Sequence, residues 1–334
     1  MMQIVFDKPN SAVLWDTPDR PTGAGEVRVR MAYTALSAGT ERANLVGDPN
    51  VAGARTAGAP SFPRMLGYSG SGIVEEIGEN VSDLRPGDRV IARWGCHREY
   101  NTLPACNVMK IPSERISMAD ASFVFISTFA LAAVRKCRIE LGESCLVVGL
   151  GLLGMFSVQY ARLAGAMPVI AADFNAERRA LALKLGADCA LDPSDADYAE
   201  KIRELTRSGA DTAIEVTGSG DALNQALLCT APLGRVSLLG CTRTPPVIDL
   251  YHDVHFPGIA LIGAHTHARP KYESYPGYWT ERDDCDAALR FLASDRLDIR
   301  SVIHEIHAPE DAPEVYGRLA RDPRFPIGIV FKWT

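Results

Sequence analysis

Gly149, Gly151 and Gly154 have the spacing of a turn that binds the pyrophosphate of a dinucleotide. They follow an apolar run at 145–148 with the composition of a buried parallel strand, and they open a segment, 152–163, with apolar residues at helical spacing. In such a turn the first glycine allows the bend, the second lets the backbone approach the phosphates, and the third lets the helix pack on the strand. The sequence therefore predicts a strand, a phosphate-binding turn and a helix.

The start of this helix offers free backbone N–H groups, and Leu152 and Leu153 are its first residues. Such groups bind phosphate oxygens. A glycine motif alone is weak support, because glycines occur in many turns for conformational reasons. The context strengthens it, since an apolar run at 168–172 predicts a second strand that ends in Asp173.

A carboxylate at Asp173 is placed to accept hydrogen bonds from the adenosine ribose hydroxyls. Because its charge repels a 2′-phosphate, the sequence favours NAD over NADP. Arg178 and Arg179 would receive that phosphate if they folded back, but their place at a helix start favours a solvent-facing orientation. The alternative is that Asp173 only caps this helix, and we favour the ribose role.

Composition excludes several function classes. A chain of 334 residues with net charge −6 and interspersed charges is long enough for two domains and lacks the basic face of a nucleic-acid-binding protein. No stretch approaches the roughly 18 consecutive apolar residues of a membrane span. The first residues lack the features of a signal peptide, and the eight cysteines include no Cys-x-x-Cys pair. We therefore expect a cytoplasmic protein with reduced thiols and with neither a membrane nor a nucleic-acid partner.

The two halves of the chain have different patterns. Residues 1–121 contain segments of alternating polarity, which predict an antiparallel, barrel-like β domain. Residues 122–264 alternate between strand and helix patterns, which predicts a doubly wound parallel sheet. The loops that leave its strands at Thr217 and Cys241 should face the cofactor. Residues 265–334 contain one helix and a final strand, and we expect them to return to the first domain.

Two runs identify a family resemblance. Residues 67–78 read G-x-x-G-x-G-I-V-E-x-I-G and residues 84–90 read L-x-P-G-D-R-V. Followed by the dinucleotide unit, these runs resemble the medium-chain dehydrogenase/reductase superfamily, in particular its zinc-type alcohol dehydrogenases. The resemblance covers nearly the whole chain. It implies a GroES-like first domain, an NAD-binding Rossmann domain, cofactor contacts from Thr128 and His265, and a homodimer or homotetramer.

The chain departs from this family at the zinc ligands. By resemblance, Ala38 occupies the position of the first ligand cysteine, and Gly67-Tyr68-Ser69 replaces the family's Gly-His-Glu run. The last ligand cysteine is replaced near Val124. Zinc needs nitrogen, thiolate or carboxylate donors, which alanine and valine do not supply. The four closely spaced cysteines of the structural zinc lobe are missing too. The sequence therefore predicts an enzyme without zinc.

Without zinc, another group must handle the proton of the substrate hydroxyl. Tyr68, at a former ligand position, is the leading candidate, because a phenol can donate to a developing alkoxide. An equally weighted alternative is that its ring only fills the volume of the metal. Thr40 matches the family's proton-relay hydroxyl, and Glu41 replaces the aspartate beside it, although Glu41 and Arg42 would also suit a structural ion pair.

Two histidine positions are further candidates. His97 lies where the family's chain passes close to the active site, although lone histidines are more often structural. His265 and His267 follow the last strand of the cofactor domain, which lies near the nicotinamide in relatives.

The reaction class follows from the resemblance. The run 37–42 resembles the hydroxyethyl-bacteriochlorophyllide dehydrogenase group, whose substrate is a secondary alcohol. We therefore expect interconversion of a secondary alcohol (a polyol, a sugar derivative or a similar compound) and its ketone. One alternative is a zinc-free quinone or enoyl reductase, which Asp173 disfavours because NADPH is usual there. Another is a non-catalytic nucleotide-binding protein. The aromatic cluster at 272–279 suits either a sugar ring or a subunit interface.

Overall fold

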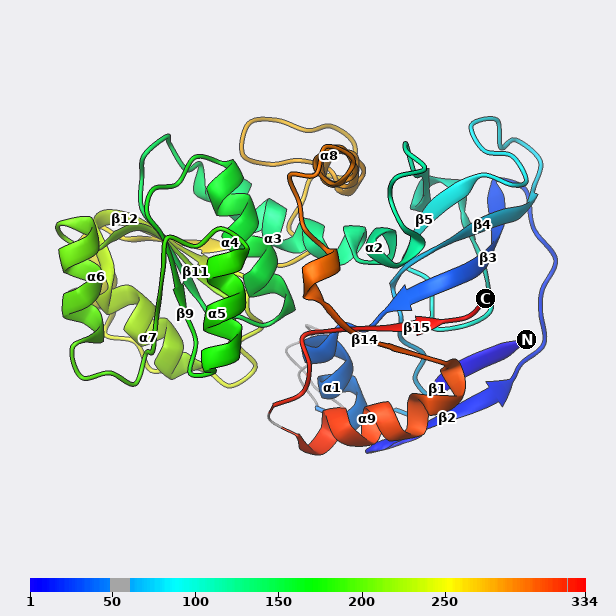
Figure 1. Cartoon of the computed structure of the whole chain (residues 1–334), viewed down its shortest axis with the longest axis horizontal. Helices are drawn as coiled ribbons and strands as arrows, with labels where there is room; N and C mark the ends of the chain where they lie inside the picture. Colours follow the sequence, from blue (N-terminus) through cyan, green and yellow to red (C-terminus); the bar gives the residue numbers. More distant parts are fainter. Residues whose placement is uncertain (49–60, 323) are drawn as a thin grey trace. The chain divides into compact units, whose positions relative to one another are not determined.

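The computed structural model describes residues 1–48, 61–322 and 324–334, which divide into two compact units (Figure 1). Unit 1 comprises Met1–Ile126 and Ile299–Thr334, and unit 2 comprises Ser127–Asp298. The sequence analysis divided the chain after residues 121 and 264. In the structure, by contrast, residues 265–298 belong to unit 2. The reason is a buried ion pair in which Arg135 Nε lies 2.9 Å from an oxygen of Asp284, joining the last helix of unit 2 to its first.

Unit 2 is built on a six-stranded parallel sheet with the order β10-β9-β8-β11-β12-β13. Its strands are β8 (Cys145–Val148), β9 (Val169–Ala172), β10 (Cys189–Leu191), β11 (Ala210–Glu215), β12 (Thr230–Leu238) and β13 (Ala260–Gly263). From β8 the chain moves outward to β10 and then returns to β11 on the other side. This reversal opens a crevice at the carboxyl ends of β8 and β11, where ligands bind in doubly wound sheets.

Helices alternate with these strands, as the sequence predicted. They are α3 (Val124–Cys137), which crosses the boundary of the units, α4 (Leu152–Leu163), α5 (Ala176–Lys184), α6 (Tyr198–Thr206), α7 (Gly220–Leu228) and α8 (Glu281–Ala293). Helix α4 contacts β8 and β9, and α7 contacts β11 and β12. Strands β8 and β9 are buried along their whole length. Their sequences are therefore continuously apolar, without the alternation of polar and apolar residues that a half-exposed strand has.

Unit 1 contains a seven-stranded, mostly antiparallel sheet in the order β14-β15-β3-β4-β5-β7, with β6 also paired to β3. Its strands are β3 (Glu26–Ala35), β4 (Ser69–Ile77), β5 (Arg89–Arg93), β6 (Tyr100–Pro104), β7 (Val108–Lys110), β14 (Ile303–His307) and β15 (Gly328–Lys332). Strand β3 alternates buried and half-buried residues, the pattern of a sheet with one face on the core. Strand β15 pairs with β3, so the last strand of the chain lies in this sheet.

A second layer of unit 1 holds the segment that carries several candidate residues. A hairpin of β1 (Met2–Lys8) and β2 (Ser11–Asp16) shares a core cluster with α1 (Ala38–Val46) and α9 (Ala312–Arg321), and the short helix α2 (Met118–Ser122) packs on β3 and β4. Figure 1 shows α1 and α9 beside this hairpin. Helix α1 therefore has a fixed buried face, from which its side chains reach the core of unit 1.

All eight cysteines are free thiols. None of the helices in the part of the chain that the structure describes combines the length and the apolar character needed to span a bilayer.

Candidate functional site

The glycine turn joins β8 to α4. Gly149 has φ of +92°, in the left-handed region that side chains other than glycine rarely adopt. A Cβ added to Gly154 would lie 2.0 Å from the Gly149 carbonyl oxygen, so only glycine lets α4 pack this closely on the turn. Gly151 is the N-cap of α4, and a Cβ there would meet open space. Leu152 and Leu153 follow as the first residues of the helix, so its free N–H groups face the end of β8.

Asp173 lies immediately after β9 and is connected to this turn. One of its carboxylate oxygens accepts from the backbone N–H of Leu150 at 2.7 Å, and the other accepts from the N–H of Asn175 at 2.8 Å. Asn175 is the residue that caps α5, because its side chain accepts from the N–H groups of Glu177 and Arg178. The helix-cap alternative for Asp173 is therefore wrong, and its carboxylate braces the glycine turn.

The two arginines after Asp173 are folded back. Arg178 Nη1 lies 3.9 Å from a carboxylate oxygen of Asp173, and its side chain is only 24% exposed. Arg179 donates to the Asp173 carbonyl oxygen at 2.7 Å and to the Asp192 carboxylate at 2.8 Å. The expected solvent-facing orientation is therefore wrong for both residues, because backbone carbonyls and carboxylates at the ends of β9 and β10 attract the guanidinium groups.

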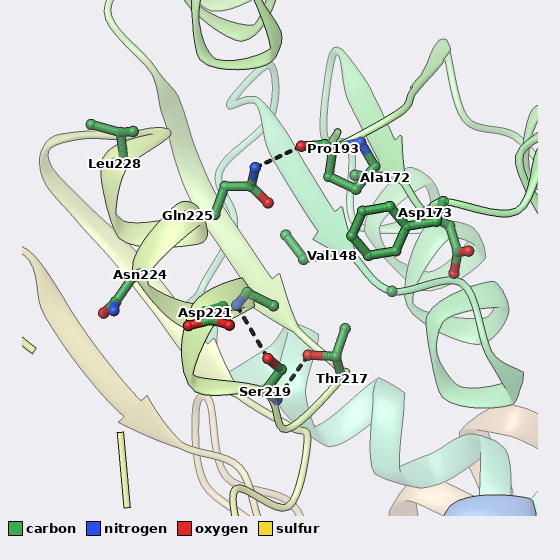
Figure 2. A pocket seen from close by; sticks show the side chains of 13 residues that line it. Val148, Ala172, Asp173, Pro193, Thr217, Ser219, Asp221, Asn224, Gln225 and Leu228 are labelled. Atoms are coloured by element: carbon green, nitrogen blue, oxygen red, sulfur yellow. Dashed lines mark hydrogen bonds between the residues drawn. The ribbon is translucent and has the colours of Figure 1, made fainter. Parts of the chain in front are cut away.

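A pocket of about 600 Å³ opens at the carboxyl ends of β8, β9 and β11. Its lining is mostly apolar and includes Val148, Ala172, Phe174, Pro193 and Leu228, with polar groups from Gly149, Asp173, Thr217, Ser219, Asp221, Asn224 and Gln225. Figure 2 shows Asp173 at one side of this pocket and Thr217 and Ser219 at another. Phe174 keeps 72% of its surface exposed, which leaves an aromatic face free for a flat ring.

Glu215 is a residue of this site that the sequence analysis missed. It ends β11, is fully buried, and accepts from the backbone N–H groups of Thr217 at 2.6 Å and Gly218 at 3.0 Å. The pKa of Glu215 is raised, because the effect of burial is larger than that of the hydrogen bonds from Thr217 and Gly218, which lower it. The carboxylate fixes the loop that carries Thr217 into the pocket. The sequence signal for this residue was a carboxylate at the end of an apolar strand. A carboxylate buried there needs hydrogen-bond donors, and the following loop can supply them.

The remaining cofactor candidates are not among the described residues that line the pocket. Thr128 is fully buried in α3, and its hydroxyl oxygen accepts from Arg269 at 3.2 Å. Cys241 is exposed after β12. His265 Nδ1 accepts from the N–H of His267 at 3.2 Å, and burial followed by the charges of His267 and Lys136 lowers the pKa of His265. The structure thus groups the glycine turn, Asp173 and Thr217 in one place.

Tyr68 and Thr40, the two candidates for proton handling, lie in unit 1. The Tyr68 hydroxyl donates to Ser37 Oγ at 2.6 Å. The centroid of its ring lies 5.9 Å from that of Trp94 and 6.0 Å from that of Phe125, and those two rings lie 5.1 Å apart, so Tyr68 belongs to a cluster of three aromatic side chains. Thr40 is half-buried on α1, three positions after Ser37.

Glu41 and His97 belong instead to a buried polar network. Glu41 accepts from the Tyr316 hydroxyl at 2.5 Å and from the Ser37 N–H at 2.8 Å, and it lies 3.1 Å from His97 Nε2. His97 Nδ1 lies 2.7 Å from the Thr34 hydroxyl. Burial, then the charge of Glu41 and the hydrogen bond to it, raise the pKa of Tyr316 well above its usual value, so this phenol stays protonated.

This network changes the interpretation of both candidates. Glu41 is fully buried and His97 is 1% exposed, so both side chains are shielded from solvent. In the part of the chain that the structure describes, Glu41 forms no ion pair with Arg42, which donates instead to the Ala320 carbonyl oxygen at 3.4 Å. Both carboxylate oxygens of Glu41 point into the core. The geometry therefore favours a structural role for Glu41 and His97.

Replacing Glu41 with alanine should lower the free energy of unfolding by about 3–5 kcal/mol, because it leaves buried donors without their acceptor. Urea denaturation measures this value. Arg42→Ala is the matched control, since Arg42 is exposed on the same helix, and it should change stability by no more than about 0.5 kcal/mol. Equal effects of the two substitutions would contradict the assignment of Glu41 to the core.

The former zinc positions do not fit a zinc ion. Ala38 and the fully buried Val124 have no donor atoms, and the Ser69 hydroxyl donates to the Ser122 carbonyl at 2.6 Å. Zinc in proteins takes thiolate, imidazole or carboxylate ligands, of which these positions hold none. Within residues 1–48, 61–322 and 324–334, moreover, no three His, Cys, Asp or Glu side chains are grouped to hold a metal.

Comparison with known proteins identifies the family. Residues 23–113 match the family described as alcohol dehydrogenase GroES-like domain, and residues 153–281 match the zinc-binding dehydrogenase family. An L-threonine 3-dehydrogenase of Anaeromyxobacter sp. (strain K) is 30% identical over 244 residues, which cover 64% of this chain and 69% of the relative. The chain belongs to the medium-chain dehydrogenase/reductase superfamily. This confirms the predicted fold class of a Rossmann sheet with a GroES-like domain.

Other members of the superfamily match nearly the whole chain. The D-guloside 3-dehydrogenase of Escherichia coli (strain K12) is 29% identical over 335 residues, which cover 95% of both proteins. The crystal structure of galactitol-1-phosphate dehydrogenase from Escherichia coli has the same fold, with a TM-score of 0.84 at 21% identity over 99% of this chain and 100% of that chain. This superfamily member is therefore an NAD(P)-dependent oxidoreductase that acts on CH–OH donors, as the sequence predicted.

Proposed function

We propose that this dehydrogenase interconverts a secondary alcohol of a polyol or sugar derivative and its ketone, with NAD as cofactor and without zinc. The observation that carries the proposal is the Asp173 carboxylate at the side of an adenosine-sized pocket next to the glycine turn. The substrate class is supported by relatives named for a guloside and for galactitol 1-phosphate. Both names describe compounds that carry secondary hydroxyls.

NAD is favoured by charge. A 2′-phosphate on the ribose would meet the Asp173 carboxylate, whereas unmodified ribose hydroxyls would donate to it. Two observations favour NADP: the guanidinium of Arg178 is 3.9 Å from that carboxylate, and a structural relative from Sinorhizobium meliloti 1021 is bound to NADP. Because Asp173 already neutralises Arg178 and sits directly at the pocket, we assign the preference to NAD.

When bound, the dinucleotide supplies or accepts the hydride. The protein must then handle one proton, and Tyr68 is the proposed acid and base. During ketone reduction its O–H donates to the developing alkoxide; during alcohol oxidation its oxygen accepts the proton of the hydroxyl. Thr40, half-buried on α1, remains a candidate to orient the same hydroxyl. The proposed reaction has no step through a metal, because Ala38 and Val124, at two of the positions where the family has zinc ligands, have no donor atoms.

The absence of zinc is directly measurable. Purified protein should contain less than one zinc per chain, and dialysis against EDTA should leave its turnover unchanged, because Ala38 and Val124 have no donor atoms. Elemental analysis together with rates before and after dialysis gives the result. One tightly bound zinc per chain whose removal abolishes turnover would refute the zinc-free mechanism.

A substrate panel tests the function as a whole. Methyl glycosides, galactitol and 2,3-butanediol are offered with NAD, and the formation of NADH is followed by absorbance. We expect turnover with at least one secondary alcohol and a kcat/KM at least about tenfold higher with NAD than with NADP, equivalent to 1.4 kcal/mol. Turnover only of quinones or enones with NADPH would instead support the reductase alternative.

A further inference from the structure

Ser37 is the N-cap residue of α1, but its side chain does not cap the helix. Serine at this position normally accepts a hydrogen bond from a backbone N–H of the first turn. Ser117 at the start of α2 does so, accepting from the N–H of Asp120 at 3.0 Å, and Thr280 at the start of α8 accepts from Asp283 at 3.2 Å. The Ser37 hydroxyl instead accepts from Tyr68 at 2.6 Å.

The N–H of Ser37 is anchored from the opposite side. It donates at 2.8 Å to Glu41, whose side chain is fully buried and is held in turn by Tyr316 and His97. At the other end of the hydrogen bond, the Tyr68 ring packs against Trp94 and Phe125, whose rings also contact each other at 5.1 Å. Both partners of the hydrogen bond therefore have further contacts that support their positions.

We propose that Ser37 is the positioning residue that holds the Tyr68 phenol and stabilises its deprotonated form during the reaction. This inference rests on the proposed role of Tyr68. A neutral hydroxyl pair exchanges donor and acceptor roles by rotation, so the Ser37 O–H can donate to Tyr68 when the Tyr68 proton leaves. Hydrogen bonds to a charged oxygen are stronger than those to a neutral one, so this contact strengthens as phenolate forms.

The proton balance is simple. In ketone reduction the Tyr68 O–H bond would break and the carbonyl oxygen would gain that proton, while the carbonyl carbon would receive the hydride that a bound reduced dinucleotide would supply. The phenolate then holds the Ser37 hydrogen bond until solvent water returns a proton. Alcohol oxidation runs the same steps in reverse, with the oxidised dinucleotide as hydride acceptor.

The test is a set of variants assayed with the fastest substrate of the panel. Ser37→Ala should lower kcat about 10- to 100-fold with little change in KM, because it removes a contact that is strongest in the transition state. It should also move the pH at which alcohol oxidation reaches half its maximum upward, since the phenolate is less stabilised. Ser37→Thr, which keeps the hydroxyl, should restore most of the rate. Ser117→Ala is the matched control and should keep the kcat of the unmodified protein.

Three further measurements keep the outcome decisive. In a Tyr68→Phe background, Ser37→Ala should have no additional effect on kcat, because the two residues act as one unit. Ser37→Gly repeats the test at a position where glycine is a good N-cap, should the alanine variant fail to fold. Ultraviolet titration of tyrosinate should show the Tyr68 contribution, identified against Tyr68→Phe, at higher pH in Ser37→Ala.

The results separate this inference from the proposed function. If Tyr68→Phe loses activity while Ser37→Ala and Ser37→Gly retain the unmodified rate and pH profile, Ser37 is overturned and the role of Tyr68 stands. If Tyr68→Phe retains full activity, both fail. An equal loss from Ser37→Ala with and without Tyr68 overturns the positioning role, because that loss would not pass through the phenol.

Discussion

Tyr68→Phe is expected to lower kcat about 10²- to 10⁴-fold, the usual contribution of a positioned general acid or base. The substitution removes one oxygen and leaves the ring, whose contacts with Trp94 and Phe125 hold its place. Stability should therefore change little, and binding of NADH should not change, since the proposed cofactor residues lie in unit 2. Steady-state rates and fluorescence titration with NADH provide the two measurements.

The control for this prediction is Tyr33→Phe. Tyr33 is also half-buried in unit 1, on β3, and has no proposed part in the reaction, so its variant should keep the kcat of the unmodified protein. An unchanged kcat in Tyr68→Phe would show that the ring only fills the volume beside Trp94. That was the alternative interpretation of this tyrosine.

Asp173→Asn should raise the Kd for NADH about 10- to 100-fold, because hydrogen bonds to a charged group contribute about 1.5–3 kcal/mol. Asparagine keeps one acceptor oxygen, so it preserves a bond such as the one from Leu150 and leaves the glycine turn in place. The same change removes the charge that repels a 2′-phosphate. The ratio of NADPH to NADH affinity should therefore rise, and fluorescence titration with both cofactors measures it.

Two companion variants show where this effect comes from. Asp188→Asn removes a carboxylate of unit 2 that pairs with Arg162 at 3.0 Å, away from the residues lining the pocket, and should leave both affinities unchanged. In the double variant Asp173→Asn with Arg178→Ala, the gained affinity for NADPH should fall again, because Arg178 would supply the phosphate contact. Tighter binding of NADPH than NADH by the unmodified protein would contradict the assignment of NAD.

Much of the fold could be predicted because its signals are local. The buried strands β8 and β9 are short apolar runs, and α4 has the bounds that its apolar spacing predicted. The sequence analysis did not identify β1, α1, β14 or α9. In α9 the spacing of Val315, Tyr316 and Leu319 was an available signal, whereas α1 contains a glycine and a threonine and has only a weakly apolar face. Such a helix is stabilised mainly by tertiary packing.

The sequence by itself determined the glycine turn and the acidic residue after the second strand, because each is a matter of residue type at a fixed local spacing. The same kind of pattern carries the prediction that the zinc ligands of the family are replaced. Only the tertiary structure decided where the side chains of Glu41 and His97 lie and what they contact. Glu41 meets Tyr316 across 275 positions of the chain, and its hydrogen bonds remove it from solvent. It likewise decided that Ser37 contacts Tyr68 rather than its own helix, because a side chain's partner depends on which distant segments the fold brings within hydrogen-bond distance.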